Sequence, residues 1–323
     1  MATKKPQLAQ SEIVEALPLA CASEAAAVAF LEEQRWGKDC ANACCSECGS
    51  VAVYQMKDKT TGERKRFLWR CRDCSKQYTV RTGTIYAESL IPLHKWCRAL
   101  WEAASAKNCV SALEMSRRLQ VTYKTALFMM HRIRHAMADG PDAPKLGGVV
   151  EADETYVGGK PRNRSTKKGR NPNNPKMPVF AVVERGGEVR ARVMPSVTSE
   201  NVKDALLEAC DTSATLMTDE LAVYKFVGRP FARHERINHR RGEYVRKSGY
   251  GLPKVTTNSI EGFFSRVKRG LNGTFHAVSK EHLHRYIDGF AFIYNTREMN
   301  DGERTLELIR RTEGKRLMYK PTA

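Results

Sequence analysis

Acidic side chains stand at three places in the second half of the chain where they could share divalent cations. Asp153 lies in the apolar stretch VVEADETYV, Asp219 ends the stretch ATLMTDE, and Glu261 lies in NSIEGFFSRVKRGL. A carboxylate inside an apolar strand is costly unless it is solvated, paired or bound to a metal. Mg²⁺ prefers such hard oxygen ligands, and two ions about 3.5 to 4 Å apart can activate one oxygen and stabilise a leaving 3′ oxygen. The three residues therefore predict a site for two Mg²⁺ or Mn²⁺ ions and phosphodiester chemistry.

Each carboxylate also has an ordinary explanation. Asp153 could pair with a nearby Arg, and Asp219 could cap the next helix. Asn258, followed three residues later by Glu261, is the Asn form of a capping box, which would explain Glu261 without chemistry. The combination in chain order, at the ends of a strand, a strand and a helix, favours chemistry. Lys268 lies two turns after Glu261 on the same helix face, where we expect it to contact a substrate phosphate.

The elements that must position these side chains form an α/β domain, which the patterns predict over residues 146–300. Alternation in VVEADETYV places Glu151, Asp153 and Thr155 on one face of a strand. Asp219 would lie at the carboxyl end of its strand, the edge at which open α/β sheets usually bind ligands. A loop over residues 158–177 contains seven basic residues and no acidic one.

Two CxxC pairs lie earlier in the chain, with 22 residues between them: Cys45 with Cys48, and Cys71 with Cys74. Facing pairs of this kind predict a structural Zn²⁺ ion in a small β-rich module over residues 40–80. Cys44 or Cys40 could replace a ligand of the first pair, although Cys45 gives the better spacing. Because so small a module buries little apolar surface, metal binding should supply its folding energy.

Helical periodicity over residues 92–138, within a module expected over residues 81–140, predicts three helices with a short break at QVTY before the last one. This is the geometry by which the second helix of a helix-turn-helix enters the major groove. Candidate DNA contacts in it are Tyr123, Lys124, Arg132 and Arg134. Residues 1–39 are expected to form an N-terminal helical segment, and residues 301–323 a charged tail.

The charge balance points to a polyanionic partner. The chain has 54 Lys and Arg against 36 Asp and Glu, a formal net charge of +18, which favours nucleic acid. No apolar run is long enough to span a membrane and MATKKPQLAQ lacks a signal-peptide core, so we expect a cytoplasmic protein near the nucleoid with no membrane partner. Further candidate DNA contacts are Lys160, Lys167, Lys168 and Arg170 in the basic loop, and Arg266 and Arg269 beside Lys268.

Several longer stretches resemble bacterial insertion-sequence transposases of the DDE class, in the insertion-sequence family numbered 1595, over about residues 25–300. They are CSEC with CRDC, YTVRTGTIYAESLIPLHKW, KTALFMMHRIRHAM, VEADETYVGGK, TDELAVY, INHRRGEYV and NSIEGFFSRVKRGL. The resemblance implies a ribonuclease-H-like catalytic domain with a mixed sheet, in which Asp153 and Asp219 are the first two metal ligands.

The resemblance leaves the third ligand open. That position varies in the family among acidic, amide and imidazole residues, so Asn258 competes with Glu261. The spacing from Glu261 to Lys268 is similar to that of DDE enzymes, and we therefore favour Glu261. His239, in INHRRGEYV, resembles a residue close to the active site.

The chain is thus expected to be a multidomain α+β protein with a zinc ribbon, a helix-turn-helix-like module and a ribonuclease-H-like domain. The expected activity is that of a DNA transposase, which cuts the terminal inverted repeats of its element and transfers the 3′-OH to double-stranded target DNA. Holding two ends together requires a homodimer or a higher oligomer. Two alternatives remain: a DNA-binding regulator with an inactive catalytic domain, and a nuclease of this fold that cuts but does not join strands.

Overall fold

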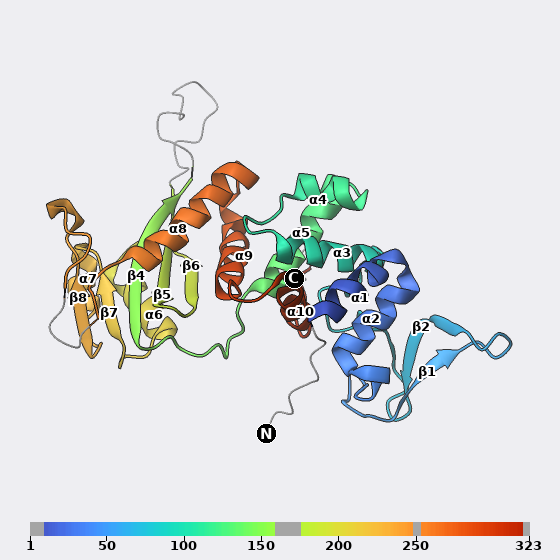
Figure 1. The fold of residues 1–323 in the computed structure, drawn as a ribbon. Helices are drawn as coiled ribbons and strands as arrows, with labels where there is room; N and C mark the ends of the chain where they lie inside the picture. Colours follow the sequence, from blue (N-terminus) through green and yellow to red (C-terminus); the bar gives the residue numbers. More distant parts are fainter. Residues whose placement is uncertain (1–9, 159–175, 248–252, 319–323) are drawn as a thin grey trace. The chain divides into compact units, whose positions relative to one another are not determined.

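The computed structural model describes residues 10–158, 176–247 and 253–318 (Figure 1). The chain divides into two compact units, one of Met1–Met137 with Glu298–Ala323 and one of Ala138–Arg297. The basic-loop candidates Lys160, Lys167, Lys168 and Arg170 lie outside the described residues. Within the described ranges, no helix combines the length and apolar character needed to cross a membrane.

The second unit contains a five-stranded mixed sheet in the order β6-β5-β4-β7-β8. Its strands are β4 (Val149–Val157), β5 (Met177–Glu184), β6 (Val189–Val193), β7 (Thr215–Thr218) and β8 (Arg233–Arg236). The first three form an antiparallel meander, and β7 and β8 add on in parallel to β4. This mixed α+β architecture agrees with the predicted fold class and is consistent with a ribonuclease-H-like domain.

Helices cover both faces of this sheet. Val150, Ala152 and Phe180 pack on one face against α6 (Ser199–Ala209) and α7 (Ala222–Val227). On the other face, α8 (Asn258–Gly270) packs against β4 and β5, and α9 (Leu283–Asn295) packs against β6 (Figure 1). Short helical segments complete the unit: η3 (His239–Arg241), the π-helical η4 (Leu271–Phe275) and η5 (Lys280–His282).

Helix α8 is strongly amphipathic, which fixes which of its side chains reach solvent. Its buried apolar residues are Ile260, Phe263, Phe264 and Val267, at the spacing of one helical face. Their burial against the sheet leaves the opposite face exposed, and that face includes Glu261 and Lys268. The apolar stripe therefore orients the polar residues of the helix.

The first unit is mostly helical and includes a three-stranded antiparallel sheet. Its elements are α1 (Gln10–Ala22), α2 (Glu24–Trp36), η1 (Lys38–Cys40), β1 (Val53–Lys57), β2 (Arg64–Cys71), β3 (Gln77–Tyr78), α3 (Leu93–Ser105), α4 (Ala112–Leu119), α5 (Tyr123–Met137) and α10 (Asp301–Arg310). The small sheet packs on α2, where the Trp36 ring lies 5.2 Å from that of Trp69 and 6.1 Å from that of Tyr78, between centroids.

The C-terminal region differs from its prediction. Residues 301–310, which were expected in a charged tail, form α10, which packs against α1 and α3. A capping box between Asn300 and Glu303 begins the helix, and Leu306 and Ile309 are buried. The many charges of this stretch hid an apolar face at helical spacing.

Candidate active site and metal centre

Asp153 lies in β4, and Asp219 directly follows β7, the parallel neighbour of β4. Glu151 of β4 pairs with Met217 of β7, and continuing this register by two residues brings Asp153 opposite Asp219. Neighbouring strands are about 4.8 Å apart, so this register predicts that the two carboxylates are close to each other. Asp219 Oδ1 accepts a hydrogen bond from the backbone N–H of Leu221 at 2.9 Å, which holds it in the turn after β7.

Burial and neighbouring negative charge both act on the carboxylates of the site. Burial raises the pKa of Asp153 to about 7, and the negative charges of Glu154, Asp219 and Glu261 add to this rise. Burial also raises the pKa of Asp219, against the lowering effect of the Leu221 N–H. Carboxylates gathered at this cost are a suitable oxygen ligand set for a divalent cation, which would relieve their repulsion.

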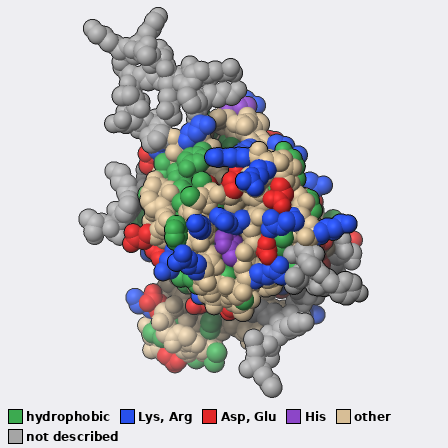
Figure 2. Space-filling view, turned by 90° about the vertical axis from the view of Figure 1, so that its left-hand side faces the viewer, with side chains coloured by type: hydrophobic (Ala, Val, Ile, Leu, Met, Phe, Trp, Pro, Cys, Tyr) green, Lys and Arg blue, Asp and Glu red, His purple; other side chains and the backbone are tan. Residues whose placement is uncertain are grey.

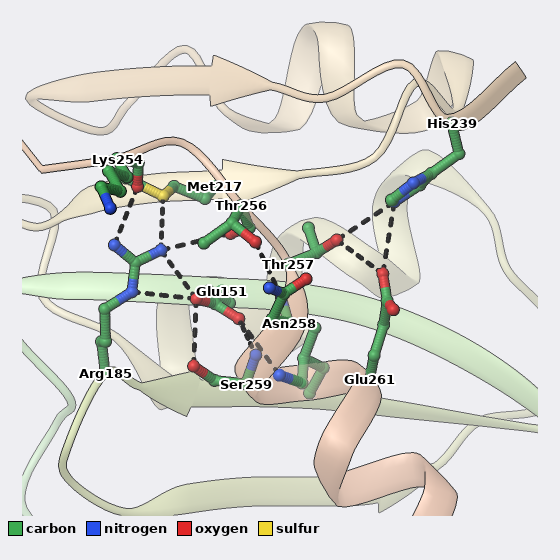
Figure 3. A network of polar contacts seen from close by, with 11 residues as sticks. Glu151, Arg185, Met217, His239, Lys254, Thr256, Thr257, Asn258, Ser259 and Glu261 are labelled. Carbon is green, nitrogen blue, oxygen red and sulfur yellow. Dashed lines mark hydrogen bonds and ion pairs between the residues drawn. The ribbon is translucent and has the colours of Figure 1, made fainter. Parts of the chain in front are cut away.

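Glu261 enters the site from the first turn of α8 (Figure 3). Thr257 Oγ1 donates a hydrogen bond to Glu261 Oε1 at 2.9 Å, and His239 Nε2 lies 3.4 Å from the same oxygen. His239 Nε2 also hydrogen-bonds Thr257 Oγ1 at 3.1 Å. The structure therefore places His239 beside Glu261 and fixes the orientation of both side chains through Thr257.

The capping-box explanation for Glu261 is wrong. The helix begins at Asn258, with Thr257 as the residue before it, and the Glu261 N–H donates to Thr257 O at 3.1 Å as in a continuing helix. Asn258 is exposed, and its N–H donates to Thr256 Oγ1. The Glu261 side chain is thus turned to Thr257 and His239, which leaves the helix start to be capped by another group.

An open cleft of about 700 Å³ extends from the carboxylates along the exposed side of α8. Asp153 and Glu261 line one part of it, and Lys268, Arg269 and Asn272 line another. Lys268 occupies the position predicted from its spacing, two turns along the face from Glu261. The cleft combines acidic groups suited to cations with basic groups suited to phosphate.

Glu154 also lines this cleft, although it was not among the site residues predicted from the sequence. It projects to the opposite face of β4 from Asp153, where Tyr224 Oη donates to Glu154 Oε2 at 2.6 Å. Burial raises the pKa of Glu154, while the Tyr224 hydrogen bond lowers it. The only signal in the sequence was its position beside Asp153, since Tyr224 approaches from a distant helix.

The predicted zinc ligands gather in one cluster: Cys45, Cys48, Cys71 and Cys74, with all four sulfur atoms within 4.8 Å of one another. Sulfur atoms are 3.5 Å apart between Cys45 and Cys74 and 3.7 Å apart between Cys48 and Cys71. A tetrahedral ion with Zn–S bonds of about 2.3 Å separates its sulfur ligands by about 3.8 Å. The cluster therefore fits zinc, and neither Cys44 nor Cys40 belongs to it.

Backbone N–H groups stabilise the thiolate form of one cysteine in each knuckle. The N–H of Cys48 lowers the pKa of Cys45, and the N–H of Cys74 lowers the pKa of Cys71 to about 7. Zinc binds thiolates, so these turns prepare the ligands for the metal.

The helix-turn-helix candidates divide into two groups. Tyr123 and Lys124 are exposed in the first turn of α5, as a DNA contact requires. Arg132 and Arg134 are only 6% and 2% exposed, so their assignment as DNA contacts is wrong. Spacing along a helix does not show whether an Arg is buried or exposed, and the sequence therefore suggested a basic surface at this place.

The two buried guanidinium groups instead satisfy backbone carbonyls. Arg132 Nη1 donates to Ile85 O at 2.7 Å and to Ala87 O at 2.9 Å, and Arg134 Nη2 donates to Val110 O at 3.2 Å. These bonds explain how the charges are tolerated inside the helical unit.

Basic side chains also gather on the β7–β8 side of the sheet unit (Figure 2). Exposed members near these strands are Lys225, Arg229, Arg236, Arg240 and Arg241. Of the α8 candidates, Arg269 is exposed in the cleft, whereas Arg266 is partly buried over the ring of Tyr294, 5.9 Å from its centroid.

Comparison with known proteins finds a matching family model for the sheet unit and another for the zinc-ribbon region. The family model of the ISXO2-like transposase domain, of the group numbered IS1595, matches residues 145–295, and that of the transposase zinc-ribbon domain matches residues 22–77. The chain is 28% identical over 281 residues to a protein of Halobacterium salinarum described as an uncharacterized protein in transposable element ISH50. That match covers 83% of this chain and 90% of the relative. The predicted resemblance is confirmed.

Replacing Cys74 by Ser should abolish tight zinc binding, because three thiolates and a hydroxyl hold zinc far less well than four thiolates. Zinc content by mass spectrometry should fall from about one ion per chain, and tryptophan emission should shift to the red as the Trp36–Trp69 contact opens. Cys44→Ser is the matched control and should keep its zinc. Loss of zinc from Cys44→Ser with retention in Cys74→Ser would refute the assignment.

Replacing Asp153 by Asn should stabilise the metal-free protein at pH 8. The pKa of Asp153 is 3.8 unfolded and about 7 folded, so its ionisation destabilises the fold progressively as pH rises through this window, and the gain should vanish near pH 4. A gain on the order of 1 to 2 kcal/mol would raise the melting temperature by a few degrees.

Calorimetric melting of the two proteins with and without Mg²⁺ checks this expectation. Mg²⁺ should stabilise the wild type and have little effect on Asp153→Asn. Asp204→Asn, at an exposed site on α6, controls for the loss of a surface charge. A lower melting temperature for Asp153→Asn at pH 8, or an equal Mg²⁺ effect on both proteins, would count against the site.

Proposed function

Because two family models of IS1595 transposases match this chain, over residues 145–295 and 22–77, we propose that it cuts DNA at the ends of its element and joins the freed 3′-OH to target DNA. The observation that carries this proposal is the parallel register of β4 with β7, which pairs Glu151 with Met217 two residues before Asp153 and Asp219, while Glu261 lines the same cleft as Asp153. Three carboxylates from a strand, a strand and a helix are what two-ion phosphodiester chemistry needs.

Asp153, Asp219 and Glu261 would hold the cations through carboxylate oxygens, the ligands that Mg²⁺ and Mn²⁺ prefer. Their fit to such ions is supported by the raised pKa of Asp153, since burial and the neighbouring charges disfavour its ionised form without a cation. Two bound ions supply activation of the attacking oxygen and stabilisation of the leaving one. We favour Glu261 over Asn258 as the third ligand, because Glu261 lines the cleft.

The remaining residues of the cleft bind and orient the substrate. Lys268 offers a point charge to a phosphate two helical turns from Glu261, and Arg269 can extend that contact along the strand. His239 and Thr257 keep the Glu261 carboxylate from rotating out of the site. With the substrate so placed, both reactions use the same groups.

In the first reaction, the oxygen of water attacks the phosphorus at the element end, the P–O3′ bond breaks, and the 3′ oxygen leaves as a hydroxyl after taking a proton. In the second, this 3′-OH loses its proton and attacks a phosphorus of target DNA. A new P–O3′ bond forms and the corresponding P–O3′ bond of the target breaks. The reaction exchanges one phosphodiester for another and needs no co-reactant.

Double-stranded DNA is the partner that we propose for the other basic parts of the chain. The zinc ribbon and the first turn of α5, with exposed Tyr123 and Lys124, would bind the terminal repeats, and the cleft would receive the scissile strand. Two ends must be joined in one event, which requires at least a dimer. Because its proposed substrate is DNA, we expect the protein to act in the cytoplasm.

Separate Asp153→Asn, Asp219→Asn and Glu261→Gln variants should still bind end DNA, but their cleavage rate should fall by about 100-fold or more. Losses of this size are usual when an enzyme loses one group that stabilises charge in the transition state. The assay is Mg²⁺-dependent nicking and joining of a duplex that carries the terminal repeats of the element. Asn258→Ala is the matched control and should cut.

Full cleavage by Asp153→Asn or Asp219→Asn would end the proposal. Cleavage that survives Glu261→Gln but not Asn258→Ala would reassign the third ligand. A wild type that binds without nicking would be a regulator, and one that nicks without joining would be a nuclease.

A further inference from the structure

Glu151 is a buried carboxylate beside the catalytic candidates, and the proposed function gives it no role. Glu151 is on the same face of β4 as Asp153, two residues earlier, and is fully buried. Its Oε2 accepts hydrogen bonds from the backbone N–H groups of Ser259 at 2.7 Å and Ile260 at 3.1 Å (Figure 3). Glu151 thus caps the start of α8, the role that the sequence had assigned to Asn258.

Glu151 has no oxygen left for a metal ion. Its Oε1 accepts from Arg185 Nε at 3.0 Å, from Arg185 Nη2 at 2.7 Å and from Ser259 Oγ at 3.1 Å. Together with the two backbone bonds to Oε2, these contacts use the roughly four lone-pair positions of a carboxylate. Its negative charge is balanced by Arg185 and by the positive end of the helix dipole.

Arg185 extends the same network to the segment that leads into α8. Its Nη1 donates to Lys254 O at 2.9 Å, and its Nη2 donates to Thr256 O at 3.2 Å. Glu151 and Arg185 together therefore fix both the segment that leads into α8 and the first turn of that helix. Glu261 follows Ile260 directly, so whatever sets the helix start also sets the third carboxylate.

We propose that Glu151 and Arg185 are positioning residues, which set the start of α8 against β4 so that Glu261 can share cations with Asp153 and Asp219. This inference rests on the proposed function. The link is short on both sides, because Glu151 is two residues from Asp153 in one strand and its helical partners immediately precede Glu261. A displacement of about 1 Å between catalytic groups can cost about 100-fold in rate, so an anchor at this point has a direct effect on metal affinity.

Glu32 provides the comparison that distinguishes a positioning role of Glu151 from a purely structural one. Glu32 is 2% exposed and accepts two hydrogen bonds from Arg64 and one from Trp69 Nε1, each at 2.7 Å, in the first unit. It is a buried carboxylate clamped by an Arg, as Glu151 is, but has no catalytic carboxylate in its element. Glu32→Gln therefore controls for the general cost of disturbing a buried ion pair.

The experiment measures Mn²⁺ binding to the full-length, zinc-loaded chain by electron paramagnetic resonance, together with the melting temperature and the Mg²⁺ dependence of end cleavage. Glu151→Gln should raise the half-saturating Mn²⁺ concentration by about 10- to 100-fold, the usual effect of losing a residue that orients metal ligands. High Mg²⁺ should recover part of the cleavage. Glu32→Gln should lower the melting temperature and leave Mn²⁺ affinity unchanged.

Arg185→Lys replaces Glu151→Gln in the experiment if the latter does not fold. This variant keeps the positive charge and the contacts of Glu151 to α8, but it loses the paired hydrogen bonds of the guanidinium group to Glu151. It should shift Mn²⁺ affinity in the same direction by a smaller factor. Folded variants of both residues with wild-type Mn²⁺ affinity would overturn the inference, as would an equal loss of affinity in Glu32→Gln. Mn²⁺ affinity that Asp153→Asn leaves unchanged would instead overturn the proposed active site, and the inference with it.

Discussion

The concentration of negative charge around the half-buried Asp153 is the constraint around which the sheet unit is organised. Burial raises the pKa of Asp153, and the negative charges of Glu154, Asp219 and Glu261 add to this rise. Loops would relax to separate such charges. Here Asp153 is held by a central strand and Asp219 by the end of its parallel neighbour, while the apolar face of α8 fixes the side from which Glu261 enters. Regular secondary structure thus opposes the repulsion.

Parts of this arrangement depend only on local sequence, and those parts could be predicted. Alternation in VVEADETYV identified the face of Asp153, helical spacing placed Lys268 beyond Glu261, and two CxxC pairs named the four sulfur ligands that now cluster. The family resemblance supplied the order of the carboxylates. In each case the relevant periodicity or turn lies within a few residues of the group concerned.

The rest depends on contacts between distant segments. Nothing local shows that Glu151 receives the first N–H groups of α8, more than 100 residues later, so Asn258 looked like the better cap. Nor can spacing distinguish a surface Arg on α5 from Arg132, whose charge is satisfied by carbonyls 45 and 47 residues away. The register of β4 with β7 is also nonlocal, and it decides whether Asp153 and Asp219 meet.

The chain as a whole is basic, whereas one part of its cleft is acidic, and this contrast has a consequence for the order of events. A net charge of +18 attracts DNA to the surface, but the carboxylates around Asp153 repel a phosphate that approaches the cleft. Lys268 and Arg269 offset that repulsion at one part of the cleft only. If the proposed function holds, cations would enter with the scissile phosphate or before it, since the acidic part of the site would attract DNA only when they are bound. In the proposed function, metal binding is thus a condition for substrate entry as well as for chemistry.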